Sequence, residues 1–106
     1  MGKFIYGTPS VTVDFDDRVL AHLKVVIVAK LRRGESLMLN WETPENGDMG
    51  HSSVWLNPSI PLQFDFEGKR EPEINRVWLE ELVKLANTPA GLRVTPEPEQ
   101  PELSNK

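Results

Sequence analysis

The chain of 106 residues contains no cysteine, and this absence excludes three kinds of site. Without cysteine a protein has no disulfide framework, no thiolate zinc site and no cysteine nucleophile. A composition of this kind is typical of a reducing compartment. We therefore expect a cytoplasmic protein.

The chain also lacks a long apolar run. Its longest, Val25 to Ala29, is far shorter than the roughly 20 residues that a membrane-spanning helix needs. The first residues, MGKFIYG, lack the apolar centre of a secretory signal. These features predict a soluble protein with no membrane partner.

An excess of basic residues is missing as well. Lysine and arginine number 12 against 16 aspartates and glutamates, so the formal net charge is −4. Nonspecific nucleic-acid binding needs cationic side chains that neutralise phosphates, so this charge argues against a binder that works by bulk electrostatics. Binding of nucleic acid through a local basic patch is still possible.

The length of the chain predicts a single domain. At this length we expect it to bury roughly 60 to 70 per cent of its unfolded surface.

The clearest pattern that is present runs from Asp16 to Gly34 and predicts an amphipathic helix. Apolar residues recur there at spacings of three and four, and the segment is about twice the usual strand length. Asp16 or Asp17 suits the N-terminus, because a carboxylate is stabilised at the positive end of the helix dipole. Gly34 suits the C-terminus, because glycine adopts the left-handed conformation that ends many helices.

Alternating apolar and polar residues predict short strands on both sides of this helix. Strands are expected at 3–7, 10–16, 36–42, 52–57, 62–67 and 92–95. Residues 43–51 contain proline, Asn-Gly and a second glycine, which predicts a surface loop. A second helix is expected from Pro72 to Asn87, because proline suits the first helical turn.

This order of elements predicts an α+β fold in two layers, in which two helices cover one face of one mostly antiparallel sheet. The domain would span residues 1–95. Residues 96–106 are rich in proline and glutamate, have almost nothing to bury, and are expected to form a disordered tail. The expected inner face of the sheet consists of Val11, Val13, Phe15, Leu37, Leu39, Trp41, Val54, Leu56, Leu62, Phe64 and Phe66.

Five stretches of the sequence carry a resemblance to known proteins. They are KFIYG at 3–7, DDRVLAHLKVVIVAKLRRGES at 16–36, VWLNPSIPLQF at 54–64, NRVWLEEL at 75–82 and ANTPAGLRVTPEP at 86–98. They resemble a family of short bacterial proteins of unknown function whose members often carry the label "ATP-dependent DNA ligase". That label implies, at most, an accessory role beside DNA.

The residues of a ligase active site are not in the sequence. A nucleotidyl-transferring ligase needs a lysine nucleophile in a Lys-x-Asp-Gly setting and carboxylates that hold Mg²⁺. No such tetrapeptide occurs, since Lys69 is followed by Arg70-Glu71-Pro72. We therefore predict no catalytic residues and no cofactor, and enzymatic activity ranks third among the function classes.

Carboxylates and histidines could form a metal site, but an ordinary solvent-exposed role is the favoured interpretation for both. Four carboxylates on strand faces could hold Mg²⁺ if their strands were neighbours, but acidic residues on solvent faces are ordinary. These are Asp14, Asp16, Asp65 and Glu67. His22 and His51 are the only histidines, which is too few for a zinc site. His22 is expected to make a surface hydrogen bond on the first helix.

The outer face of the sheet is the preferred binding surface. Alternation places there Thr12, Asp14, Met38, Asn40, Ser53, Trp55, Asn57, Gln63 and Asp65. A tryptophan on such a surface can anchor a partner protein or stack on a base. One bulge would reverse the alternation, in which case Trp55 belongs to the core.

A basic cluster of Lys30, Arg32 and Arg33 is the second candidate surface. It can contact phosphates, or it can simply complement the negative end of the helix dipole.

These two surfaces predict two alternative functions. The first is a non-catalytic interaction module that binds a protein partner, or itself, through Trp55, Met38, Asn40 and Asn57. The alternative is a nucleic-acid-binding accessory of DNA ligation or repair, in which the basic cluster acts with Trp55.

Overall fold

The computed structural model describes residues 1–45 and 48–99. Eight elements follow one another there in the predicted order. They are β1 (Gly2–Tyr6), β2 (Val11–Phe15), α1 (Asp17–Arg32), β3 (Leu37–Glu45), β4 (Asp48–Leu56), β5 (Leu62–Asp65), α2 (Arg76–Ala86) and β6 (Leu92–Arg93). The α+β class and the order of elements are therefore confirmed.

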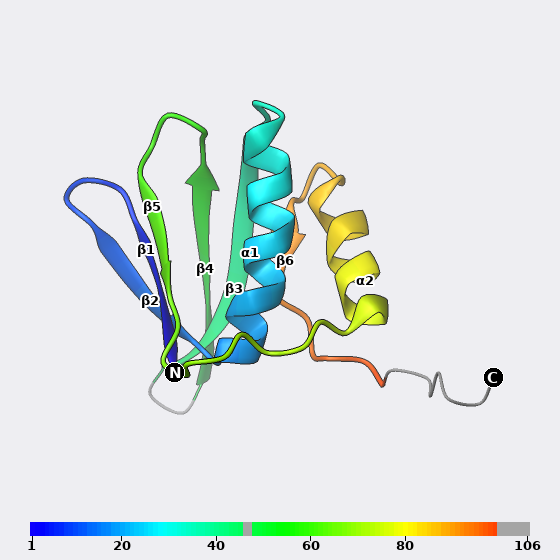
Figure 1. Ribbon diagram of the computed structural model, residues 1–106. Coiled ribbons are helices and arrows are strands. Elements are labelled where there is room, and N and C mark those ends of the chain that lie inside the picture. The colour runs from blue at the N-terminus through cyan, green and yellow to red at the C-terminus, as the bar shows by residue number, and fades with distance from the viewer. Residues whose placement is uncertain (46–47, 100–106) are drawn as a thin grey trace.

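The strands form two three-stranded sheets instead of the single sheet expected. One has the order β2-β1-β5 and is antiparallel; the other has the order β4-β3-β6, in which β3 and β6 are parallel. Pro58 and Pro61 lie between β4 and β5 and cannot donate hydrogen bonds to a ladder, and β5 pairs with β1. The two sheets lie side by side (Figure 1), and the Tyr6 hydroxyl donates a hydrogen bond to the Trp55 carbonyl.

Helix α1 provides much of the core, as its pattern predicts. Its apolar side is at most 2% exposed at Leu20, Leu23, Val26 and Ile27. Gly34 follows the helix with φ +76°, the left-handed conformation expected of it. At the other end, the Asp17 carboxylate accepts hydrogen bonds from the backbone N–H groups of residues 67 and 68, so it holds the chain after β5 against α1.

Helix α2 begins four residues later than predicted. Asn75 is its N-cap, and the Asn75 side chain accepts a hydrogen bond from the Trp78 backbone N–H at 3.1 Å. A capping side chain satisfies an amide that has no partner within the helix, so it fixes the start more strongly than a proline that is merely tolerated there. Pro72 lies outside the helix.

The loop expected over residues 43–51 is also wrong. Strands β3 and β4 pair along their whole length, from Leu37 with Leu56 to Glu45 with Asp48. Only residues 46–47, which lie outside the described residues, separate the two strands. Asn-Gly is typical of two-residue hairpin connections, so the ladder continues past Pro44.

Both helices lie on the same side of the strands, with α2 beside α1 and β6 (Figure 1). Of the predicted inner face, Phe15, Leu37, Leu39 and Leu56 are buried. The prediction is wrong for Val11, which is 57% exposed. The other members are partly buried against the core: Val13, Trp41, Val54, Leu62, Phe64 and Phe66.

Residues after β6 still contact the domain. The Asn75 side-chain amide donates hydrogen bonds to the Glu97 carboxylate at 2.8 Å and to the Pro98 carbonyl at 2.9 Å. These contacts lie beyond the domain boundary expected at Thr95, and the expected tail from residue 100 onward lies outside the described residues. Across residues 1–45 and 48–99, no helix has both the length and the apolar character needed to cross a membrane.

Candidate binding site

The outer face of sheet β4-β3-β6 is the side that turns away from α1. Residues Leu37, Leu39 and Leu56 of β3 and β4 are buried under the helices, so their neighbours along each strand point outward. Directly opposite residues in a ladder share a face, which arranges the outward side chains in three rows. The rows are Met38 with Trp55, Asn40 with Ser53 and Arg93, and Glu42 with His51.

Trp55 is the large apolar side chain of this face. It is 53% exposed, so the alternation predicted from the sequence holds across β4. Its row partner Met38 is half-buried. Gly91 adopts φ +91° and lies so close to Met38 that an added Cβ would come within 2.6 Å of the Met38 carbonyl oxygen. The chain before β6 therefore approaches β3 as closely as a backbone can, with glycine required there.

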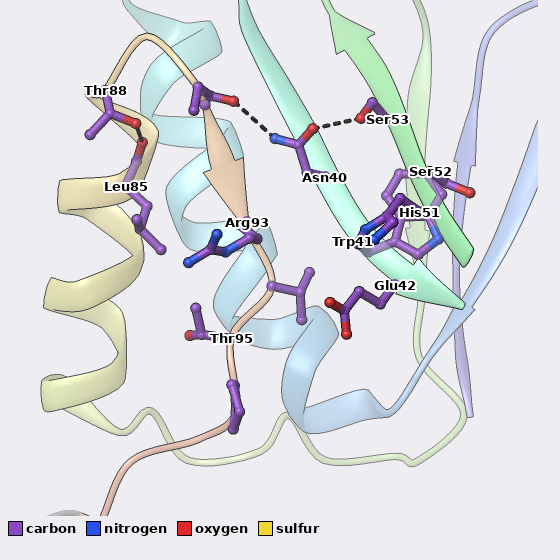
Figure 2. Close-up of a pocket in the computed structure, with 14 residues that line it drawn as sticks. Asn40, Trp41, Glu42, His51, Ser52, Ser53, Leu85, Thr88, Arg93 and Thr95 are labelled. Carbon is purple, nitrogen blue, oxygen red and sulfur yellow. Dashed lines mark hydrogen bonds between the residues drawn. The ribbon is translucent and has the colours of Figure 1, made fainter. Parts of the chain in front are cut away.

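Asn40 ties the three strands of this sheet together. Its amide nitrogen donates to the carbonyls of Ala90 at 3.0 Å and Leu92 at 3.1 Å. Its amide oxygen accepts a hydrogen bond from the Ser53 hydroxyl at 2.6 Å. Figure 2 shows this side chain reaching from β3 to both neighbours. These hydrogen bonds hold Asn40 in one position, so the middle row forms a fixed floor for the groove described next.

A groove of about 510 Å³ runs over this floor. Its sides come from β4, from the chain between α2 and β6, and from residues that follow β6 (Figure 2). The polar side chains that line it include Glu42, His51, Thr88 and Arg93. Figure 2 shows Arg93 extending from β6 toward the side of α2 and Glu42 extending from β3 toward β6.

Three polar side chains of the groove point into solvent. Arg93, Glu42 and His51 are exposed. In the part of the chain that the structure describes, none of their side chains forms an ion pair or a hydrogen bond. Arg93 is not among the residues predicted from the sequence, because only the parallel pairing of β6 with β3 brings it beside Asn40.

The remaining predicted residues lie elsewhere. Asn57 follows β4 and stabilises a turn, with its amide oxygen accepting from the Ser59 backbone N–H at 2.9 Å and its amide nitrogen donating to the Ser36 hydroxyl at 3.2 Å. Lys30 is 12% exposed; it donates to the Asn87 side chain at 2.8 Å and pairs with Glu35 at 2.9 Å. The hydrogen bond from Lys30 lowers the pKa of Glu35.

Arg32 and Arg33 are exposed at the end of α1, which lies on one side of the strands (Figure 1), whereas the register of β3 and β4 directs Trp55 to the other side. The structure therefore does not bring the basic cluster and Trp55 onto one face. Of the four acidic residues, Asp14 and Asp65 are separated by Lys3, which lies between them in the register of β2-β1-β5 and pairs with Asp14 at 2.8 Å. Among residues 1–45 and 48–99, no three histidines or carboxylates are placed to share a metal ion.

A second polar cluster, called the buried cluster after its buried members His22 and Asn75, also contains the partly exposed side chains of Arg18 and Glu97. The surface hydrogen bond expected of His22 is wrong, because its side chain is fully buried. The Asn75 backbone N–H donates to Nε2 of His22 at 2.8 Å, so Nε2 is an acceptor and Nδ1 carries the ring proton. Nδ1 then donates to the Arg18 carbonyl at 2.7 Å, and the ring packs against Trp78 in a tilted arrangement with 4.5 Å between centroids.

Glu97 closes the buried cluster from the C-terminal side. The Arg18 guanidinium donates to both of its carboxylate oxygens at 2.7 Å, a bidentate pair. The hydrogen bonds from Arg18 and then from Asn75 lower the pKa of Glu97 to about 2, and the bond to Glu97 raises the pKa of Arg18. Within residues 1–45 and 48–99 the polar groups of this cluster bond to one another and to the backbone, so the cluster joins α1, the start of α2 and the chain after β6.

Comparison with known proteins identifies the family. Residues 1–97 match a domain of unknown function, DUF7882. The chain belongs to the DUF7882 family. The match ends at Glu97, so it includes the residue that completes the buried cluster. No curated protein and no solved structure matches the chain. This match does not support the ligase label that the resemblance implied.

Proposed function

We propose that this DUF7882 domain is a non-catalytic binding module that recognises a partner protein through the outer face of sheet β4-β3-β6. The observation that carries the proposal is the exposed Trp55 beside a groove whose charged side chains have no partner among the described residues. A polar side chain that the fold does not use is available to a ligand. A cytoplasmic location, expected from the lack of cysteine, belongs to the same proposal.

This face combines an exposed apolar side chain with a rigid arrangement of polar groups, and both properties favour binding. An exposed tryptophan buries a large apolar area when a partner covers it, which is why tryptophan is enriched in binding hot spots. Asn40 holds the floor through three hydrogen bonds, so little conformational freedom is lost on binding. Association with a second copy of the chain through Trp55 belongs to the same class of function.

Nucleic-acid binding is the second candidate, and the exposure of Arg32 and Arg33 is the observation in its favour. Three observations favour a protein partner instead. The net charge is −4, Lys30 is engaged with Glu35 and Asn87, and Trp55 lies on the other side of the sheet from the basic cluster. A strand of nucleic acid held by Arg32 and Arg33 would have to pass around the domain to stack on Trp55.

Site-specific photo-crosslinking in cells tests the proposal. A benzophenone amino acid at position 55 or 38 should give a crosslinked adduct with one discrete protein. The matched control places it at Val77, which is 38% exposed on α2, away from the groove. The expected result is an adduct from the outer face and none from Val77.

Two further measurements separate the alternatives. Light scattering of the purified chain beside Trp55→Ala shows whether the partner is a second copy, because the change should then reduce the measured mass. Fluorescence anisotropy with labelled duplex and nicked DNA at low salt tests the second candidate. Equal adducts from all three positions, together with DNA binding that is lost on changing Lys30, Arg32 and Arg33 to alanine, would overturn the proposal in favour of nucleic acid.

A further inference from the structure

This inference rests on the proposed function and concerns the chemistry of the partner. We infer that the outer face of sheet β4-β3-β6 binds an extended peptide segment in which an acidic side chain enters the groove and pairs with Arg93, and an apolar side chain packs on Trp55 and Met38, which lie outside the groove lining on the same face. Three observations lead to it: an arginine in the groove that has no partner among residues 1–45 and 48–99, an exposed apolar surface on the same face, and the register that fixes how far apart they are.

Arg93 supplies the site for the acidic side chain. Its guanidinium is exposed, lines the groove and has no carboxylate partner within the described residues. The ion pairs of the described chain all involve residues outside the groove. A guanidinium binds a carboxylate through two parallel hydrogen bonds, which gives direction as well as attraction. Within the groove, Arg93 is therefore the side chain that an acidic residue of a partner can recognise.

Trp55 and Met38 supply the apolar end. They are row partners on adjacent strands, and Trp55 is half-exposed. Arg93 lies one row further along the strands and two strands across the sheet. One row is about 7 Å along a strand and two strands are about 10 Å across, so the diagonal is about 12 Å. An extended peptide covers that distance in about four residues.

The expected recognition sequence therefore has an apolar and an acidic residue three or four positions apart. Glu42 adds a restriction. Its free carboxylate lies in the next row beyond Asn40, beside His51, so a second acidic residue at that end of the peptide would be repelled. A basic or neutral residue fits there. This pattern distinguishes the groove from a nonspecific anion site, which would favour any cluster of negative charge.

The test selects peptides from a displayed library of random segments about 12 residues long, long enough to cross the groove in extended form. The full chain is the bait, beside Trp55→Ala, Arg93→Glu and the control Arg70→Gln. Arg70 is an exposed cation between β5 and α2, outside the groove. The most enriched peptide is then synthesised, labelled and titrated by fluorescence anisotropy.

We expect wild type and Arg70→Gln to enrich the apolar–acidic pattern and Arg93→Glu to replace the acidic position with lysine or arginine. In titrations Arg93→Gln should weaken binding roughly tenfold, as loss of a charge-assisted pair does, and Glu42→Gln should not weaken it. Peptides enriched through Trp55 with no acidic preference would overturn this inference and leave the proposed function standing. Enrichment that depends on neither Trp55 nor Arg93 would overturn both.

Discussion

The molecule contains two groups of polar side chains of similar composition, the buried cluster and the outer-face groove, and they differ in how their bonds are used. Arg18, His22, Asn75 and Glu97 bond to one another and to the backbone, and no buried polar side-chain atom of the described chain lacks a partner. Arg93, Glu42 and His51 bond to nothing in the described part of the chain. The first group stabilises the fold, and the second is available to another molecule.

This difference shows why residue type alone is a weak guide to function. A histidine, an arginine and a glutamate occur in both groups. Burial without a partner costs about 1 to 3 kcal/mol per polar group, so interior polar residues are selected with their partners. Exposed charges contribute little to stability, so they can be kept for binding. The comparison predicts large stability effects from one group and small ones from the other.

The largest effect is expected from His22→Ala. The change opens a cavity beside Trp78 and leaves the buried Asn75 backbone N–H without its acceptor, so the free energy of unfolding should fall by about 3 kcal/mol. His22→Gln, whose side-chain oxygen can take the place of Nε2, should recover part of the loss. Urea denaturation followed by circular dichroism measures both. Equal losses in the two variants would mean that the ring volume matters and the hydrogen bond does not.

Gly91→Ala should come next, with a loss of about 2 kcal/mol or more. Its φ of +91° disfavours any side chain, and the new Cβ would meet the Met38 carbonyl oxygen at 2.6 Å. The change also forces β6 away from β3, so it should weaken binding at the groove. The control is Gly34→Ala, which has positive φ but no atom within 4 Å of the new Cβ, and should lose less.

Glu97→Gln should destabilise the domain by about 1 to 2 kcal/mol at neutral pH, since the Arg18 pair is partly exposed and therefore partly screened. The pKa of Glu97 is lowered in the folded chain, so its contribution is complete above pH 4.5 and is lost as the pH falls toward about 2. Thermal unfolding across this window should show a smaller pH dependence in Glu97→Gln than in wild type. Identical pH profiles would contradict the assignment.

The smallest effect on stability should come from the groove. Arg93→Gln and Glu42→Gln each remove an exposed charge with no partner in the described chain, so the free energy of unfolding should change by less than about 0.5 kcal/mol. Urea denaturation of both variants checks this. A loss comparable with that of His22→Ala would mean that these charges support the fold, and the comparison between the two groups would fail.

The α+β class, the order of the elements and the first helix follow from the sequence alone, and the outward direction of Trp55 is one of the two alternatives that the sequence left open. They depend on local patterns: period-two alternation along β4, spacings of three and four along α1, and a glycine after its end. Such patterns are written into consecutive residues and need no knowledge of distant neighbours. Predictions from local patterns were wrong where pairing between strands determined the structure. The loop expected over residues 43–51, for example, is mostly part of the paired strands β3 and β4.

Only the tertiary structure determines which strands pair and which distant residues become neighbours. The split into two sheets depends on β5 pairing with β1, and the groove depends on β6 pairing in parallel with β3, 53 positions earlier for Arg93 and Asn40. His22 was expected on the surface because its helix position is only moderately apolar, yet Trp78 and Asn75 cover it from α2. Contacts between distant segments are set by the packing of the whole chain, which a pattern within one segment does not encode.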